Sequence, residues 1–103
     1  MAGEETLFTS EMVIAEIIWV LESYYNLEKI DVRTRMEKII NTQNLHCPNR
    51  EIIINALSIY VEKNIDYIDA YNAFMLKLNR IKEIYSFDKH FDRVSWLKRI
   101  EPA

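Results

Sequence analysis

Apolar residues recur with helical spacing in four segments of this chain. In the first, Met12 to Tyr25, they lie almost all round the expected helix, a pattern typical of a buried helix. The second segment, residues 31–40, has a charged face opposite its apolar positions, as an amphipathic helix does. The third, 50–63, carries an apolar stripe expected to face the core, and the fourth, 66–79, is a long and largely apolar helix. Ser10 and Asp31 are the expected N-caps of the first two helices, because short polar side chains accept hydrogen bonds from the free N–H groups there.

Four shorter segments are rich in β-branched, aromatic or other apolar residues and predict strands; they are 6–9, 45–47, 84–87 and 94–100. Helices that alternate with short strands favour an α/β fold with a parallel sheet. The chain of 103 residues is long enough for one domain with a hydrophobic core, and no linker or internal repeat divides it. We therefore expect a single α/β domain over residues 1–103.

Composition and charge exclude several classes of protein. The single glycine, Gly3, rules out a Gly-rich phosphate-binding loop. A net charge of −3 at pH 7 rules out bulk electrostatic capture of nucleic acid as the main mode of action, although it allows a local basic rim around an acidic pocket. The only cysteine, Cys47, forms no intrachain disulfide, and with its neighbour His46 it lacks the spaced partners of a zinc site. No apolar run approaches the roughly 20 residues of a membrane span, so a cytoplasmic protein without membrane contact is expected.

Two aspartates open the last predicted helix, in the sequence NIDYIDAYNA. Asp66 stands where an N-cap is expected, and capping alone explains an aspartate there. Asp69, three positions later, either completes a capping arrangement or acts as a functional carboxylate, because apolar neighbours such as Ile68 and Ala70 pack against its turn. The sequence leaves these alternatives open.

Glu16 and Asp88 are two further carboxylates in apolar surroundings. Glu16 interrupts the run MVIAEIIWVL and has no basic residue three or four positions away, so it either emerges into a cleft or pairs with a residue distant in sequence. Asp88 follows the expected strand IYSF, and open α/β sheets bind ligands beyond the carboxyl ends of their strands; the alternative is a turn-forming aspartate before Lys89. Together the four carboxylates suit Mg²⁺ or Mn²⁺, which can activate water and neutralise a phosphate during cleavage.

The order of these motifs resembles the PIN domain, especially the VapC-type toxin ribonucleases of prokaryotic toxin–antitoxin pairs. The segments that carry the resemblance are TSEMVIAEIIWVLESYY, NIDYIDAYNA and IYSFDKHF. Members of the family have an "AE" on the first conserved helix, a "D-x-x-D-A" at the start of a later helix and a "T-F-D" after a strand. Here these motifs correspond to residues 15–16, 66–70 and 86–88, in the same order and over nearly the whole chain.

The resemblance implies a PIN-like three-layer α/β/α sandwich on a short parallel sheet, and Mg²⁺- or Mn²⁺-dependent cleavage of RNA phosphodiester bonds. It also implies three metal ligands that are the catalytic residues: Glu16, Asp69 and Asp88. Asp66 would be a helix cap or an outer carboxylate, and Ser86 would form a hydrogen bond within the site. His90 stands where the family often has another acid, and with Lys89 it is a candidate contact to an RNA phosphate.

The start of the chain departs from the family pattern. PIN domains begin with a central strand that ends in an Asp-containing motif, whereas Met1 to Glu5 leads directly into what resembles the second strand. We therefore expect an N-terminally truncated domain that lacks this strand and one metal ligand, and the hypothesis includes an inactive form. The strand edges left open predict a homo-oligomer in which another chain fills the gap.

Two other interpretations compete with the nuclease. In the first, the chain is a non-catalytic module that binds an antitoxin-like protein through its apolar helices and is indifferent to Mg²⁺. In the second, the chain is an all-α bundle in which the acids are caps and solvated charges. Such a bundle would place Glu16, Asp69 and Asp88 far apart.

Overall fold

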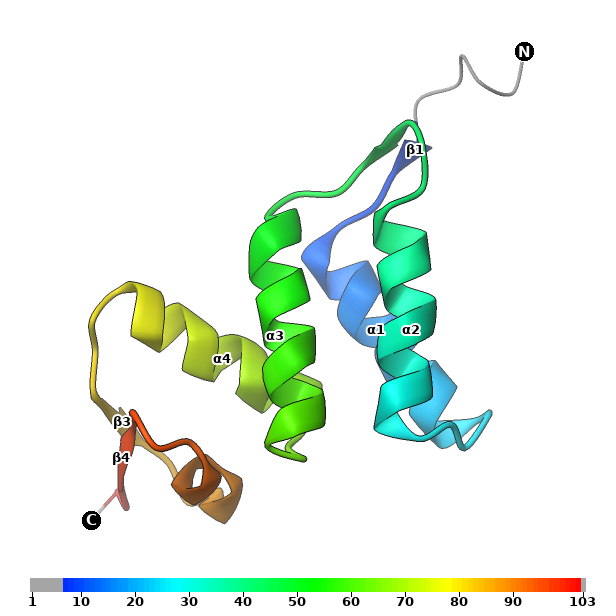
Figure 1. The fold of residues 1–103 in the computed structure, drawn as a ribbon. Helices are drawn as coiled ribbons and strands as arrows, with labels where there is room; N and C mark the ends of the chain where they lie inside the picture. Colours follow the sequence, from blue (N-terminus) through cyan, green and yellow to red (C-terminus); the bar gives the residue numbers. More distant parts are fainter. Residues whose placement is uncertain (1–6, 103) are drawn as a thin grey trace. The chain divides into compact units, whose positions relative to one another are not determined.

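The computed structural model describes residues 7–102, in which helices alternate with short strands (Figure 1). The chain divides into two compact units, one ending at Ile54 and the other beginning at Asn55. All strand pairing in the described part of the chain is parallel and lies within one unit or the other. The predicted helix-rich α/β class with short parallel sheets is therefore confirmed. Two predictions concern residues outside the described part of the chain. One is that the chain starts without the first strand of the family, and the other is that Thr6 belongs to the strand 6–9.

Each unit contains one two-stranded parallel sheet. The strands of the first unit are β1 (Leu7–Phe8) and β2 (Leu45–His46), and those of the second are β3 (Glu83–Tyr85) and β4 (Lys98–Ile100). The register places Leu7 beside Leu45 and Ile84 beside Arg99. The four predicted strand positions are thus confirmed, but the strands are shorter than predicted and form two pairs among the described residues instead of one sheet.

Two helices pack together in the first unit, α1 (Glu11–Ser23) and α2 (Lys29–Ile40). Helix α1 begins after Ser10, whose hydroxyl accepts a hydrogen bond from the backbone N–H of Val13 at 3.2 Å, as predicted for an N-cap. The buried apolar residues of this unit come mainly from the facing sides of these helices: Ile14, Ile18, Val32, Met36, Ile40 and Ile53.

The second unit is organised around helix α4 (Tyr67–Leu78) and a 3-10 helix, η2 (Lys89–Arg93), which pack against each other. Helix α3 (Arg50–Glu62) begins in the first unit and ends in the second. The Arg93 side chain donates a hydrogen bond to the carbonyl oxygen of Asn64, which ties η2 to the segment before α4. The core of this unit consists of Ala56, Leu57, Ile59, Tyr60, Ile65, Tyr67, Ala70, Ala73, Phe91, Val94 and Leu97.

Asparagine makes most of the sharp backbone turns. Positive φ angles between 50° and 65° occur at Asn26, Asn44, Asn49, Asn64 and Arg80. Left-handed backbone is disfavoured for most residues with a Cβ atom, and asparagine tolerates it better than other non-glycine residues. Since the chain has a single glycine, asparagine replaces it at four of these five turns. Arg80, directly after the C-cap of α4, is the exception.

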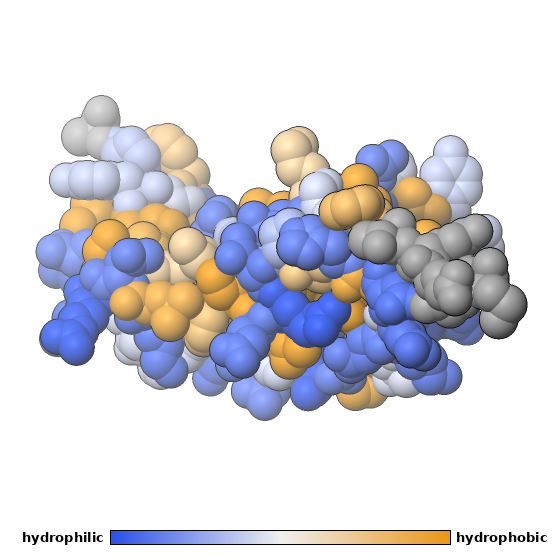
Figure 2. Space-filling model, turned by 90° about the horizontal axis from the view of Figure 1, so that it is seen from above, coloured by the Kyte–Doolittle hydropathy of each residue, from blue (hydrophilic) through white to orange (hydrophobic). Residues whose placement is uncertain are grey.

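Two details of the helices differ from the sequence prediction. Helix α1 is not buried all round: Met12 is 83% exposed and Trp19 59% exposed, because α2 covers only one of its faces within this unit. Other apolar side chains also reach the surface, where orange and blue areas alternate (Figure 2). Helix α2 begins at Lys29, so Asp31 lies in its first turn and is not its N-cap. No helix within residues 7–102 has the length and apolar character to cross a membrane.

Candidate metal centre

Asp66 and Asp69 lie in the segment that starts helix α4. Asp66 occupies the predicted N-cap position, but its side chain makes no capping hydrogen bond to the first turn and is exposed. Asp69 lies in the first turn and is half-buried beside Ala70, which is fully buried. The geometry therefore leaves both carboxylates available for another role, although their positions near the helix N-terminus also suit a negative charge.

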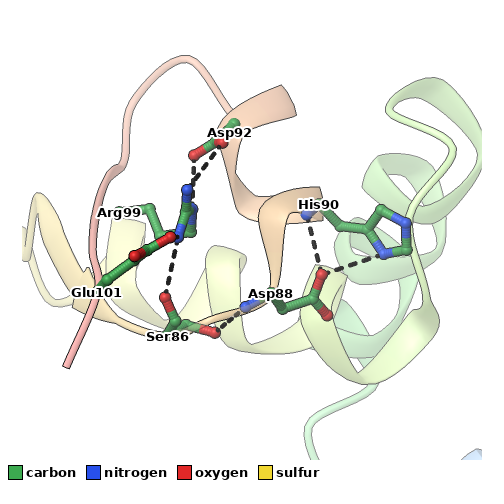
Figure 3. Close-up of polar contacts among 6 residues, drawn as sticks. All are labelled: Ser86, Asp88, His90, Asp92, Arg99 and Glu101. Carbon is green, nitrogen blue, oxygen red and sulfur yellow. Dashed lines mark hydrogen bonds and ion pairs between the residues drawn. The ribbon is translucent and has the colours of Figure 1, made fainter.

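Asp88 lies between β3 and η2 and is held by three contacts (Figure 3). Its Oδ1 accepts a hydrogen bond from the backbone N–H of His90 at 2.9 Å and lies 3.3 Å from His90 Nδ1. Its own backbone N–H donates to Ser86 Oγ at 3.0 Å. Asp88 is therefore the N-cap of η2, and Ser86 fixes the turn that presents its carboxylate.

The Asp69 and Asp88 carboxyl groups, which are 19 positions apart in the sequence, form a hydrogen bond with each other. Burial, this hydrogen bond and the negative charges of Asp88 and Asp66 raise the pKa of Asp69 from 3.8 to about 6. The hydrogen bond from the His90 backbone, and then that from Asp69, hold the pKa of Asp88 below its usual range. Below about pH 6 Asp69 therefore holds the proton between the two carboxyl groups and donates it to an ionised Asp88, and above that pH both are ionised.

His90 brings an imidazole to the same place. One ligand atom each from Asp66, Asp69 and His90 lie within 4.8 Å of one another, and His90 also contacts Asp88. A set of carboxylate oxygens with one imidazole nitrogen fits a divalent cation such as Mg²⁺ or Mn²⁺, with the nitrogen donor more typical of Mn²⁺ than of Mg²⁺. The raised pKa of Asp69 indicates that these carboxylates are crowded enough for a cation to relieve their repulsion.

Arg99 supports the segment that carries Asp88, and it was not anticipated from the sequence. Its guanidinium donates to both carboxylate oxygens of Asp92 at 2.9 and 3.3 Å, to Glu101 at 3.1 Å and to the carbonyl oxygen of Ser86 at 3.2 Å (Figure 3). These contacts connect β4 with both ends of the turn around Asp88. Since Arg99 is 13 positions from Ser86, local sequence gives no signal for this contact.

Glu16 belongs to the first unit, on α1. Its side chain is exposed and lines an apolar hollow of about 440 Å³ together with Val13, Ile17, Val20, Leu21 and Tyr25. The sequence left open whether Glu16 emerges into a cleft or pairs with a residue distant in sequence. In the structure its side chain emerges into a hollow and stays exposed to solvent. Lys89 is exposed on η2.

The alternation of helices with short parallel strands places this protein in the helix-rich α/β class. The model of the PIN domain family matches residues 1–97, and the chain belongs to that family. It is 29% identical over 98 residues to a VapC ribonuclease from Aquifex aeolicus (strain VF5), an alignment that covers 95% of this chain and 72% of the relative. The predicted resemblance is confirmed. No solved structure matches the chain.

Proposed function

We propose that this chain is the metal-dependent ribonuclease of a toxin–antitoxin system and that it hydrolyses RNA phosphodiester bonds. The single observation that carries the proposal is the Asp69–Asp88 pair, two carboxyl groups from distant segments that meet beside Asp66 and His90. Similarity to a VapC ribonuclease supports RNA as the substrate. The metal ligands and catalytic residues proposed are Asp69, Asp88 and Glu16.

Each residue of the proposed site has a role that follows from its contacts. Asp88 is held ionised and oriented by the Ser86 turn and the His90 N–H, and Asp69, ionised above about pH 6, adds a second carboxylate. Asp66 and His90 border the pair and complete the donor set. Mg²⁺ or Mn²⁺ at this position would neutralise charge on the cleaved phosphate and lower the pKa of a water molecule. Lys89, exposed at the start of η2, is positioned to contact an adjacent phosphate, as is His90.

The proposal includes partners and setting. As a relative of a VapC ribonuclease, the chain is proposed to act in the cytoplasm and to be inhibited by an antitoxin-like protein. It is also proposed to form a homo-oligomer. Within residues 7–102 each sheet has only two strands, and the side chains of Phe8 and Met12 are exposed; both features support association, because unpaired strand edges and apolar surface favour contact with another chain.

A second function is favoured by one observation, the exposed apolar face of α1. Met12 and Trp19 are more than half exposed, as expected of a helix that binds another protein. On this alternative the chain is a non-catalytic module that binds an antitoxin-like partner, and its carboxylates have no affinity for cations.

Cation binding by variants of the pair separates the two functions. Asp69→Asn and Asp88→Asn are each expected to weaken Mn²⁺ and Mg²⁺ binding by more than about 100-fold, beyond the effect of most outer-shell positions, and to abolish cleavage of single-stranded RNA. Isothermal titration calorimetry measures the binding. Asp31→Asn is the matched control, since Asp31 also lies in the first turn of a helix and is exposed. Equal cation binding by all variants and the parent chain would exclude the nuclease.

A further inference from the structure

A second hollow lies at the opposite end of α4 from the carboxylates. Its volume is about 530 Å³, and it is lined by Lys77, Arg80, Ile81, Lys82, Ser95 and Trp96. Lys77 is in the last turn of α4, and residues 80–82 connect the end of this helix to β3 (Figure 1). We refer to these six residues as the basic groove. It lies entirely within the second unit.

The three cations of the basic groove have no acidic partner in the described part of the chain. Lys77, Arg80 and Lys82 form no ion pair within residues 7–102, whereas Arg99 of the same unit is paired with both Asp92 and Glu101. A cation near a helix C-terminus is favoured by the helix dipole, which accounts for Lys77. It does not account for Lys82, beyond the turn, nor for the absence of any carboxylate among the described lining residues. In a chain with net charge −3, such a local excess of positive charge points to an anionic ligand.

Arg80 occupies the groove at a conformational cost. Its φ is 59°, in the left-handed region where the other four such residues within 7–102 are asparagines. Glycine or asparagine would fit this turn with less strain, so the turn geometry alone does not explain an arginine. A positively charged side chain retained at a disfavoured position is consistent with a role in binding.

Trp96 provides an aromatic surface beside these charges. Its Nε1 donates a hydrogen bond to the carbonyl oxygen of Ala73 at 3.3 Å, which fixes the ring against α4. Lys77 Nζ lies 4.6 Å from the ring centroid. Grooves that bind single-stranded nucleic acid combine cations for the phosphates with aromatic rings on which bases stack. Both components are present here.

We propose that the basic groove binds single-stranded RNA at the other end of α4 from the carboxylate cluster, with phosphates on Lys77, Arg80 and Lys82 and a base stacked on Trp96. This proposal rests on the proposed function, since it supplies the binding site for the part of the substrate that flanks the cleaved bond. Asp69 and Lys77 are on the same helix, roughly 12 Å apart along its axis at 1.5 Å per residue, so one strand can reach both.

Binding is measured without added cation and in the presence of a chelator, where no hydrolysis is expected. A Trp19→Phe background leaves Trp96 as the only tryptophan, and a short oligouridylate is titrated while its fluorescence is followed. We expect quenching of Trp96 on binding. Replacing all three cations (Lys77→Gln, Arg80→Gly, Lys82→Gln) should weaken binding more than tenfold. It should also reduce the slope of log K against log salt by roughly 2, because three phosphates of the single strand are then no longer neutralised.

Two controls are needed. One distinguishes a loss of RNA binding from a loss of folding, and the other distinguishes the basic groove from a basic residue elsewhere on the chain. Arg80→Gly alone relieves the left-handed turn, so it should preserve or raise the melting temperature while lowering RNA affinity several-fold. Lys38→Gln removes the matching lysine from the last turn of α2 and should leave affinity unchanged. Full affinity in a folded triple variant overturns the proposal. So does equal binding of duplex RNA, or displacement of the RNA by polyglutamate at equal charge, which would indicate an acidic protein as ligand.

The outcome is independent of whether the chain cleaves RNA. If cation-dependent cleavage occurs but the triple variant binds RNA as the parent does, the groove assignment fails and the proposed function stands. If RNA binds through the groove but no cleavage occurs with Mg²⁺ or Mn²⁺, the proposed function fails and the groove stands as an RNA-binding site.

Discussion

Asp69 and Asp88 have identical side chains, yet the pKa of Asp69 is raised and that of Asp88 is lowered. The difference comes from their surroundings: Asp69 is partly buried among negative charges, whereas Asp88 accepts hydrogen bonds from the His90 backbone and from Asp69. Below about pH 6 a protonated and an ionised carboxyl group lie side by side, so the site has one negative charge fewer than at neutral pH. A divalent cation that enters below that pH must displace this proton.

Cation affinity is therefore predicted to depend on pH. Because the pKa of Asp69 is about 6, the carboxyl group is protonated below that pH, and the affinity for Mn²⁺ should fall about tenfold per pH unit there and level off above it. In the cation-free chain the sign of the effect on stability follows from the same shift. The raised pKa contributes stability that is fully present below the unfolded value of 3.8 and is lost as the pH rises through 6.

Calorimetric titration with Mn²⁺ in several buffers between about pH 5 and 8 checks this prediction, because the buffer-dependent heat counts the protons released. The Asp69→Asn variant, which cannot ionise, serves as the control. An affinity for Mn²⁺ that is constant across this range in the parent chain would contradict the assignment of the shared proton.

At the scale of single elements, two helices begin at an N-cap residue of the expected type but with different contacts. Ser10 makes a side-chain hydrogen bond to the first turn of α1, and Asp66 makes none to the first turn of α4. We predict that Ser10→Ala lowers the free energy of unfolding by about 1 kcal/mol, the usual loss for a cap. Asp66→Ala should cost less than about 0.5 kcal/mol, as for a surface substitution.

Urea unfolding followed by circular dichroism compares the two variants. Asp66→Ala should instead reduce cation affinity, because Asp66 borders the candidate centre. A large loss of stability in Asp66→Ala, with cation binding unchanged, would identify Asp66 as a cap alone.

The sequence predicted the positions of most helices and strands better than the burial of their side chains. Helices α3 and α4 begin and end within one residue of the prediction, since their apolar spacing and polar ends are features of consecutive residues. The exposure of Met12 and Trp19 was wrongly predicted, because burial of α1 depends on which elements cover it. The start of α2 was missed because Glu28 holds the N-cap position without a side-chain hydrogen bond.

In the candidate site, too, one contact was predicted from sequence motifs and others were not. The contact between Asp69 and Asp88 was expected from motifs at the ends of a strand and a helix, and the structure shows it. The contacts of Arg99 with Asp92 and Ser86 could not be foreseen, because they depend on the register of β3 and β4. That the two aspartates bind a metal ion together with Glu16 remains a proposal.

At the scale of the whole molecule, each parallel sheet has only two strands in the described part of the chain, and Phe8 of β1 is 75% exposed. We predict association of the 12.3 kDa chain into a dimer or larger assembly, measured as mass by multi-angle light scattering. Phe8→Lys should weaken this association about tenfold, because a lysine on an edge strand opposes pairing with a further strand.

Tyr85→Lys is the matched variant in the other sheet, since Tyr85 of β3 is 74% exposed. A greater effect of one substitution than the other identifies the sheet that takes part. A parent chain that is monomeric at all concentrations would contradict the prediction.

The use of asparagine in place of glycine at four left-handed turns has a consequence for durability. Asparagine is a thermolabile residue that proteins from the hottest environments tend to avoid. Asn26, Asn44, Asn49 and Asn64 are therefore the first positions to examine for chemical damage after prolonged heating. Glycine preserves the backbone conformation at each of them, so these four positions are where a longer-lived variant would be engineered first.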